Sequence, residues 1–514
     1  MRTKAILCLY FLVCLIVFIV RTAHWKQVND PAQLNYLCFL MDHGMAPYRD
    51  LLEVNMPGTY LVNWSVMHTL GGGSAAWRSF DLSLMGIAAW AMIVVARPYG
   101  WLAGALGATM FTLFHGKDGA GQQGQRDLMI AVLLLCAYAF LFTFFRRRQH
   151  WALFGFGICA GIASTIKPIP LPFAFLLIVL TTYRLWSARE PVVRPLFFAL
   201  LGLCLPLLGV FSFLAVKHSL GAFWYLLRVE MPFYTTLGRV PTGKLLSLMA
   251  SPAIRLLALT AVAVAVIKRE SWNWEISLLV IGILFGAASF FAQGKAFPYH
   301  RYPLVGFLFL WIAIEFIREL KAPGAAGRLA LGGVIFALAL LPVYVNAAAH
   351  KEWDPSYINS LSADLNRLGG SRLSGHVQCI DMPADCDNTL YRMQLVQSTG
   401  LFYDYLVFGS TQQRVVRDLR GRFWQEFEKN KPHVIVVGSG LYPYGQGYDK
   451  LASWPWFQHE LQDHYYLYGD RTFRRAEAGP RAYRIYVEKT PQPMLSNEAA
   501  VRLPSEAGIA RNTR

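Results

Sequence analysis

The chain has 514 residues, of which 55% are hydrophobic and only 15% are charged, whereas soluble domains carry about 25% charged residues. This composition excludes an ordinary soluble enzyme, and the apolar content excludes a disordered or collagen-like chain. Residues 1–350 hold 28 Lys and Arg against 13 Asp and Glu, a net charge of +15; the remaining residues hold 20 against 18, a net charge of +2. Because the cations stand between apolar runs, they indicate a membrane protein and not a nucleic-acid-binding one.

The first predicted element is the apolar run at residues 5–20, which follows Arg2 and Lys4. It resembles a signal peptide, but no small-x-small cleavage site comes after it. We therefore expect an uncleaved membrane anchor. A helix needs about 20 apolar residues to cross a bilayer, with about 17 as the lower limit. On this criterion the sequence predicts eleven spans, near residues 5–21, 79–96, 101–115, 127–145, 151–166, 168–186, 195–216, 252–267, 274–292, 303–317 and 329–346.

The moderately apolar segment 57–71 decides the orientation of everything that follows it. If it does not cross, the tight loops on the N-terminal side are basic, as the positive-inside rule requires. These loops contain Arg97, Arg146, Arg147, Arg148, Arg184, Arg189, Arg194, Lys268, Arg269, Arg318, Lys321 and Arg328. We therefore predict that 57–71 lies along or dips into the outer membrane surface and that the N-terminus is cytoplasmic. The loop 22–78 and all of 347–514 are then extracytoplasmic.

The C-terminal part, 347–490, is predicted to be a small α/β domain. Residues 432–438 are typical of a buried strand, 413–429 of an amphipathic helix, and 482–488 of an edge strand. The polar segment 491–514 is predicted to be a disordered tail. Cys379 and Cys386 have six residues between them and no further metal ligands nearby, so we expect a disulfide in an oxidising compartment. The other six cysteines lie in or near apolar runs and are expected to be buried small hydrophobes.

The first outer loop carries acids beside the membrane, where ionisable groups are costly and tend to be functional. Asp30 comes nine residues after the first span, and Asp50 ends the sequence Pro47-Tyr48-Arg49-Asp50. Asp42 is interpreted as a solvated loop residue.

The stretch from Asp30 through Tyr36, Gly44, Pro47-Tyr48-Arg49-Asp50 and Asn55-Met56-Pro57-Gly58 resembles the first periplasmic loop of GT-C glycosyltransferases. These membrane enzymes use polyprenyl-phosphate-linked sugars, and the likeness is to the protein O-mannosyltransferase-like group and to the lipid A aminoarabinose transferase. The resemblance covers about residues 1–350 and implies a GT-C-like catalytic domain over 1–346, in a bacterial inner membrane, with the C-terminal domain in the periplasm.

The resemblance also implies roles for single residues. Asp30 matches the family's proposed base, and Asp127 matches a second acid in the next outer loop. Relatives often carry another acid immediately after the first, where this chain has Pro31. The aminoarabinose transferase has a Lys before the Pro of the dipping helix, where this chain has Asn55.

Transfer of a sugar from a lipid phosphate to a hydroxyl needs a base for the proton and cations for the leaving phosphate. The outer loop around 293–303 packs cations and aromatic residues together, although Tyr, Lys and Arg also serve as plain anchors at a membrane interface. We predict that Asp30 and this loop meet across one cavity. The substrate-binding residues predicted with them are Tyr48, Asp50, Lys167, Lys295, His300, Arg301 and Tyr302.

The sequence contains few motifs that would indicate a bound cofactor. The glycines at 116–124 follow no strand and precede no Gly-Lys-Ser/Thr, so they do not form a nucleotide loop. A divalent metal ion is one option for the acids near the site, but the chain has no Asp-x-Asp motif and its ligands stay undecided.

The sequence therefore predicts a polytopic α-helical membrane glycosyltransferase with a small extracytoplasmic α/β domain. It is expected to move a sugar from a polyprenyl phosphate to a lipid, glycan or protein, with inversion of configuration at the anomeric carbon of the sugar. The alternatives are an O-antigen ligase or polymerase, which should place its main outer loop late in the chain, and a transporter, which should hold its acids within spans. A glycan receptor would not need a membrane-level acid together with a cationic loop. The sugar and the acceptor stay open.

Overall fold

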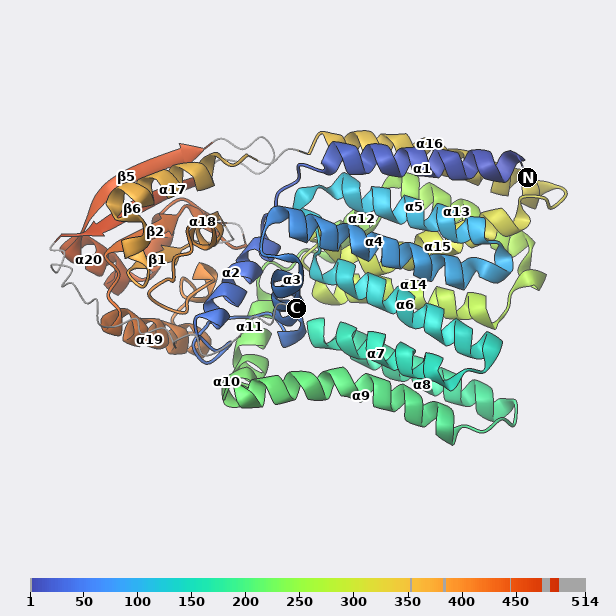
Figure 1. Ribbon diagram of the computed structural model, residues 1–514, viewed down its shortest axis with the longest axis horizontal. Coiled ribbons are helices and arrows are strands. Elements are labelled where there is room, and N and C mark those ends of the chain that lie inside the picture. Colours follow the sequence, from blue (N-terminus) through green and yellow to red (C-terminus); the bar gives the residue numbers. More distant parts are fainter. Residues whose placement is uncertain (1, 352–353, 382–384, 444, 474–480, 490–514) are drawn as a thin grey trace, which may run out of the picture.

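The computed structural model describes residues 2–351, 354–381, 385–443, 445–473 and 481–489. A bundle of long helices forms one part of the molecule, and a smaller domain with a β-sheet sits at one end of the bundle (Figure 1). The N-terminus lies at the opposite end of the bundle from this domain (Figure 1). The predicted tail at 491–514 lies outside the described residues.

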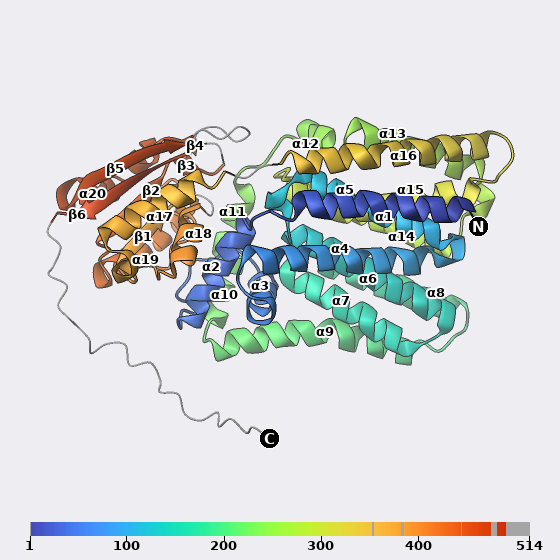
Figure 2. The same cartoon turned by 45° about the horizontal axis from the view of Figure 1, so that its top comes forward.

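Eleven bundle helices occupy the eleven segments predicted as spans, and Figures 1 and 2 show them running side by side. They are α1 (Arg2–Thr22), α4 (Ser74–Ala96), α5 (Trp101–Asp118), α6 (Arg126–Arg147), α7 (His150–Ile166), α8 (Pro170–Ser187), α9 (Val193–Val216), α13 (Pro252–Ile267), α14 (Trp274–Gln293), α15 (Tyr302–Glu319) and α16 (Ala325–Ala349).

Among the described residues, eight helices are long and apolar enough to cross a membrane, or nine if α13 and the bent preceding helix α12 (Thr242–Met249) count as one span. The predicted number of eleven is therefore not established. The remaining predicted spans are less apolar or shorter: α5 ends in the charged pair Lys117-Asp118, and α7 has only 17 residues.

The bundle is buried at its centre and apolar at its outside. Helices α6 and α15 are mostly buried, whereas α1 and α9 expose large apolar side chains such as Leu9, Val20 and Leu208. A surface of this kind is unfavourable in water and natural in lipid. The chain is thus a multi-pass membrane protein.

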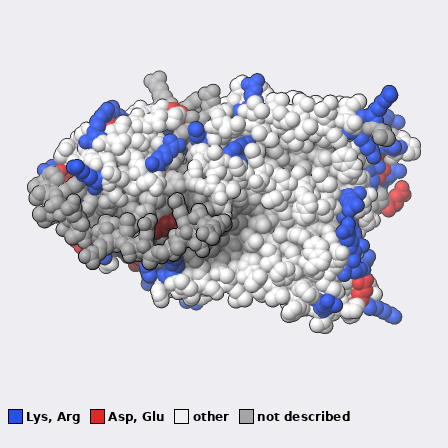
Figure 3. Space-filling view, viewed as in Figure 1, with Lys and Arg blue, Asp and Glu red and all other residues white. Residues whose placement is uncertain are grey.

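Basic residues gather at the end of the bundle that lies away from the small domain, where Figure 3 shows a band of Lys and Arg. Arg146 and Arg148 there pair with Glu275 and Glu190, at 2.7 and 2.5 Å.

The segment between α1 and α4 stays at the other end, beside the small domain (Figure 1). It forms α2 (Asp30–Asp42) and α3 (Pro57–Leu70), and the 14 residues of α3 are too few to cross a bilayer. The helix begins against the end of α7: a Cβ on Gly58 would lie 2.2 Å from Thr165 Oγ1, so only glycine permits this approach. Segment 57–71 is therefore a helix that does not traverse the bundle, as predicted.

A second connection at this end, between α9 and α13, consists of short helices: α10 (Leu220–Tyr225), the π-helix Leu226–Glu230, α11 (Met231–Thr236) and α12. A third, between α14 and α15, contains a short 3₁₀ turn at Pro298–Arg301.

The small domain has a four-stranded sheet in the order β1-β2-β6-β5. Strand β1 (Val377–Ile380) is parallel to β2 (Val434–Gly438), and β2, β6 (Arg481–Glu488) and β5 (Tyr465–Phe473) are antiparallel. A two-stranded ribbon pairs β3 (Gly440–Leu441) with β4 (Gly445–Gln446). The helices of the domain are α17 (Ser356–Leu368), α18 (Asp385–Met393), α19 (Arg414–Lys429) and α20 (Pro455–His464).

The strand at 432–438 and the helix at 413–429 are present as predicted, but the edge strand expected at 482–488 is wrong. That segment is β6, which pairs with β2 on one side and with β5 on the other. The alternation of buried and less buried residues along β6 reflects one buried face of the strand, formed by Tyr483 and Ile485. It does not indicate an open edge of the sheet. Cys379 and Cys386 are joined by a disulfide between β1 and α18.

Candidate active site

Two adjoining cavities lie where the outer loops of the bundle meet the small domain. The first, here called the carboxylate cavity, has a volume of about 280 Å³. It is lined by Asn29, Asp30, Gln33, Val54, Asn55, Gly121, Gln122, Gln125, Arg126, Tyr234, Phe297, Pro298, Tyr299, Tyr403, Tyr405 and Tyr442.

The second, here called the cationic cavity, has a volume of about 220 Å³. It is lined by Val54, Asn55, Met56, Arg126, Ile166, Lys167, Pro168, Ile169, Met231, Tyr234, Thr235, Ala292, Gln293, Lys295, Tyr299 and His300. The lining residues common to both cavities form their common wall: Val54, Asn55, Arg126, Tyr234 and Tyr299.

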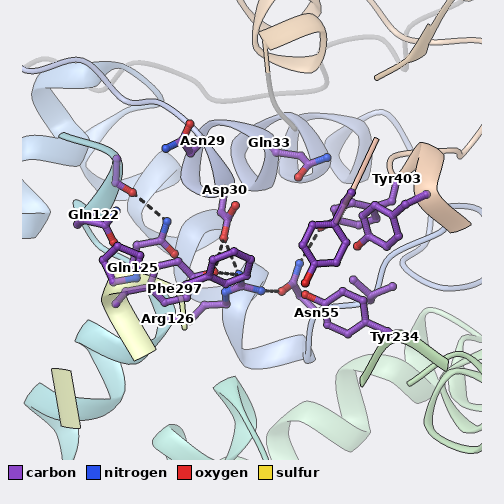
Figure 4. Close-up of a pocket in the computed structure, with 16 residues that line it drawn as sticks. Asn29, Asp30, Gln33, Asn55, Gln122, Gln125, Arg126, Tyr234, Phe297 and Tyr403 are labelled. Carbon is purple, nitrogen blue, oxygen red and sulfur yellow. Dashed lines mark hydrogen bonds and ion pairs between the residues drawn. The ribbon is translucent and has the colours of Figure 1, made fainter. Parts of the chain in front are cut away.

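Asp30 lies at the start of α2 and faces the carboxylate cavity (Figure 4). The Asp-Pro sequence suits this place, because an acid is favoured in the first turn of a helix and proline needs no amide partner there. Arg126 Nη2 lies 2.5 Å from Asp30 Oδ2, and Tyr299 Oη donates to the same oxygen at 3.3 Å. The Asp30 side chain is 30% exposed, so the carboxylate remains reachable from the cavity.

Arg126 is the first residue of α6, and the turn before it is firmly held. Asp81 Oδ1 accepts the amide hydrogen of Gly124 at 2.9 Å, and Trp77 Nε1 donates to the carbonyl of Gln123 at 3.0 Å. From this turn the guanidinium donates to Tyr299 Oη at 3.2 Å and to the side-chain oxygen of Asn55. Arg126 therefore links two other residues of the common wall, Asn55 and Tyr299, to Asp30 at the start of α2.

Asn55 is itself oriented by two neighbours. Its amide nitrogen donates to Tyr403 Oη at 2.9 Å and to the carboxyl of Glu53, so its oxygen is left to face Arg126. Tyr403 Oη also lies 3.3 Å from Glu53 Oε1. Burial raises the pKa of Glu53 to about 7, against the opposing effect of its hydrogen bonds from Asn55. The small domain thus reaches the common wall through Tyr403.

The cationic cavity combines positive charge with apolar walls. Lys167 Nζ lies 2.5 Å from Asp127 Oδ2 and 2.5 Å from Gln293 Oε1. Lys295 Nζ donates to the carbonyl of Tyr234 at 3.1 Å. Burial, together with the positive charges of Arg126, Lys167 and Arg239, lowers the pKa of Lys295 to about 7. None of the described residues that line this cavity is acidic, so an anion would find cations there without a competing carboxylate at the surface.

Asp30 and the loop at 293–303 come together, as the sequence predicts, although not through all the residues expected. Tyr299 contacts Asp30, and Lys295 and His300 line the neighbouring cavity. The placement expected for Arg301 and Tyr302 is wrong: both turn toward α5, where Arg301 Nη2 lies 2.9 Å from Asp118 Oδ1 and Tyr302 Oη donates to Asp118 at 3.2 Å. The reason is the start of α15 at Tyr302, which directs these side chains into the bundle.

Tyr48, Asp50 and Asp127 also line neither cavity. Tyr48 Oη donates to the carbonyl of Asn55 at 2.6 Å, and Asp50 binds Arg49 and the amide of Ala46, each at 2.7 Å. Both therefore shape the loop. Asp127 is 1% exposed and lies behind Lys167, whose ammonium it holds together with Gln293.

Sequence reasoning missed Arg126 and Tyr299, although both stand inside the motifs that drew attention to Asp127 and to the 293–303 loop. Glu53 and Asn55 lie in the acidic loop. The signal that could have identified them is that two polar residues stand just before Pro57, where the next helix begins. Tyr403 gave no signal, because its partner Asn55 is 348 residues away.

Within the part of the chain that the structure describes, no group of three or more His, Cys, Asp or Glu residues is placed to hold a metal ion. Near Asp30 the charged neighbour is Arg126, a cation and not a ligand. The residues present therefore do not fit the divalent metal considered from the sequence.

Three solved structures are similar to the whole architecture. ArnT from Cupriavidus metallidurans bound to undecaprenyl phosphate matches with a TM-score of 0.56 and 12% identity, covering 94% of this chain and 98% of ArnT. Its apo state gives a TM-score of 0.53 at 12% identity with the same coverage. The archaeal oligosaccharyltransferase AglB from Archaeoglobus fulgidus, in complex with an inhibitory peptide and a dolichol-phosphate, gives 0.51 at 11% identity over 85% of this chain and 69% of AglB.

No family model matches the sequence, and no curated protein matches it. This chain therefore has the same fold as ArnT and AglB, which confirms the polytopic GT-C-like fold predicted from the sequence.

Proposed function

We propose that this chain is a membrane glycosyltransferase that moves a sugar from a polyprenyl phosphate to a hydroxyl group of an acceptor. The observation that carries the proposal is the pair of cavities with a common wall. One contains a reachable carboxylate, and the other contains Lys167, Lys295 and His300 between apolar residues.

The cationic cavity suits a lipid phosphate. Phosphate oxygens bind ammonium groups through charge-assisted hydrogen bonds. Met56, Ile166, Ile169, Met231 and Ala292 supply apolar walls beside these cations, where the first units of a lipid tail would pack. The resolved ligands of the two structural neighbours, undecaprenyl phosphate in ArnT and a dolichol-phosphate in AglB, support this assignment.

The carboxylate cavity suits the acceptor and the sugar. In the proposed reaction Asp30 takes the proton of the acceptor hydroxyl as that oxygen forms a bond to the anomeric carbon. The bond from the anomeric carbon to the phosphate oxygen breaks, and the polyprenyl phosphate leaves with the electron pair. Lys167 and Lys295 stabilise the negative charge of the leaving phosphate.

The arrangement favours inversion at the anomeric carbon. Base and phosphate partners lie in different cavities, so the acceptor approaches the sugar from the side opposite to the leaving group. Arg126, in the common wall, keeps a positive charge beside both the carboxylate and the phosphate.

We propose that the site faces the periplasm of a bacterial inner membrane, with the N-terminus in the cytoplasm. The band of basic loops lies at the far end of the bundle from the site (Figure 3), which supports this orientation through the positive-inside rule. The disulfide of the small domain is consistent with an oxidising compartment.

A binding measurement on the purified full chain tests the proposal. Wild-type protein in nanodiscs should bind undecaprenyl phosphate, and Lys295→Met should weaken binding by about tenfold or more, because it removes a charge-assisted hydrogen bond. The matched control is Lys244→Met, which changes an exposed lysine on α12 at the same end of the molecule. Absence of binding in the wild type, or equal effects of both variants, would overturn the proposal.

A further inference from the structure

The carboxylate cavity is polar, but the charges of the described residues that line it cancel each other. Among the described residues that line it, only Asp30 and Arg126 are charged, and they pair with each other at 2.5 Å. The cavity is thus neutral overall, and its other polar groups are carboxamides and phenols.

We propose that the carboxylate cavity holds the sugar of the donor and selects an uncharged sugar that is rich in hydroxyl groups. This inference rests on the proposed function and names the class of sugar that the same site accepts.

The carboxamides supply hydrogen bonds that the protein itself does not use. Gln125 is 3% exposed, its Nε2 donates to the carbonyl of Gly121 at 3.0 Å, and its Oε1 has no hydrogen-bond partner among the described residues. Gln122 Oε1 is also buried without a partner there. Buried polar atoms are nearly always satisfied, and both of these line the cavity. Two unpartnered acceptors on residues that line one cavity match a ligand with hydroxyl donors.

A third carboxamide approaches the same side of the cavity. Gly121 has no side chain, and a Cβ there would lie 2.4 Å from Asn29 Nδ2, so the glycine gives Asn29 its place at the wall. Figure 4 shows Gln122 and Gln125 on one side of Asp30 and Arg126, with Tyr234 and Tyr403 on the other.

The opposite side is aromatic. Tyr403, Tyr405 and Tyr442 come from the small domain, and Tyr234 comes from the connection between α9 and α13. Aromatic rings offer flat apolar faces, and tyrosine adds a hydroxyl at the tip. A sugar ring has apolar C–H faces and hydroxyl edges, so it can pack on the tyrosines and donate to the carboxamides.

A charged sugar would upset this balance. An amino sugar adds a positive charge beside Arg126, and a uronic acid adds a negative charge beside Asp30. Either would leave one charge uncompensated in a partly buried cavity, which is unfavourable.

The test compares undecaprenyl phosphate carrying glucose, a 4-amino-4-deoxypentose or galacturonic acid, each binding to the wild-type full chain in nanodiscs. We expect the glucose lipid to bind at least about tenfold more tightly than either charged one. Gln125→Leu should weaken binding of the glucose lipid by about tenfold, the effect of one lost hydrogen bond, and should leave undecaprenyl phosphate without a sugar within about twofold. Gln149→Leu, an exposed position at the other end of the bundle, is the control.

The outcomes are distinct. If undecaprenyl phosphate binds but the three sugars bind equally, or a charged one binds best, the inference is overturned and the proposed function stands. If undecaprenyl phosphate itself does not bind, the proposed function falls and the inference falls with it. The comparison of sugars uses the wild type alone, so a variant that does not fold leaves it intact.

Discussion

The two cavities are built from different parts of the molecule. The cationic cavity takes Lys167, Gln293 and Lys295 from the ends of bundle helices and the short loops that follow them. The carboxylate cavity takes its walls from outer loops and from the small domain, with Tyr403 as the link to Asn55. Phosphate binding should therefore depend mainly on the bundle, whereas sugar transfer should depend on the bundle and the small domain together.

The largest expected effect separates catalysis from binding. Asp30→Asn keeps the shape of the side chain and removes its basicity, so turnover should fall about 10²–10⁴-fold. Binding of undecaprenyl phosphate should change little, because Asp30 does not line the cationic cavity. The control is Asp42→Asn, at the other end of α2, where the carboxyl accepts a hydrogen bond from Trp64. Near-normal turnover in Asp30→Asn would remove its assignment as base.

A pH series should affect the cationic cavity through Lys295. With a pKa of about 7, this ammonium is charged below pH 7 and loses its proton as the pH rises through that value. Affinity for undecaprenyl phosphate should fall by about tenfold from pH 6 to pH 9, with a midpoint above 7 because the bound phosphate stabilises the charged form. Lys295→Arg should flatten the profile, since arginine stays protonated. The same steep fall in the Lys295→Arg variant would assign the titration to another group.

Tyr403→Phe should affect the carboxylate cavity more than the cationic cavity, because Tyr403 lines only the first. It removes the hydroxyl that accepts from Asn55 Nδ2 and approaches Glu53, so the amide of Asn55 is less firmly directed at Arg126. We expect turnover to fall about threefold to tenfold, in the range of one hydrogen bond, with the affinity for undecaprenyl phosphate unchanged. The control is Tyr466→Phe on the exposed strand β5. A parallel loss of phosphate affinity would show that the small domain also shapes the cationic cavity.

The smallest effect on activity is expected from the disulfide. Replacing Cys379 and Cys386 by Ser should lower the stability of the small domain by about 2–3 kcal/mol, or by about 5–10 °C in its unfolding temperature. Because the bridge lies outside both cavities, turnover at low temperature should stay within about twofold. Turnover should then be lost at a lower temperature than in the wild type. Equal inactivation temperatures for the two proteins would contradict this role.

The sequence predicted much of the bundle, because long apolar runs and basic loops follow directly from the physics of a bilayer. It also indicated Asp30, Lys167, Lys295 and His300, which carry charge or can hydrogen-bond beside predicted helix ends. The fine direction of side chains was not predictable.

Neighbouring residues show why. Arg126 and Asp127 are adjacent at the start of α6, yet a helix turns about 100° per residue, so one lines the cavities and the other is buried behind Lys167. Arg301 follows His300 and points to Asp118 instead. Tyr403 enters the site only through the docking of the small domain, which no local pattern encodes.

The division of the site into a carboxylate cavity and a cationic cavity is tested most directly by a structure with undecaprenyl phosphate bound. We predict density for the phosphate between Lys167 and Lys295, with the tail leaving along Met56, Ile169 and Met231. Phosphate density beside Arg301, or against Gln122 and Gln125 in the carboxylate cavity, would contradict the account.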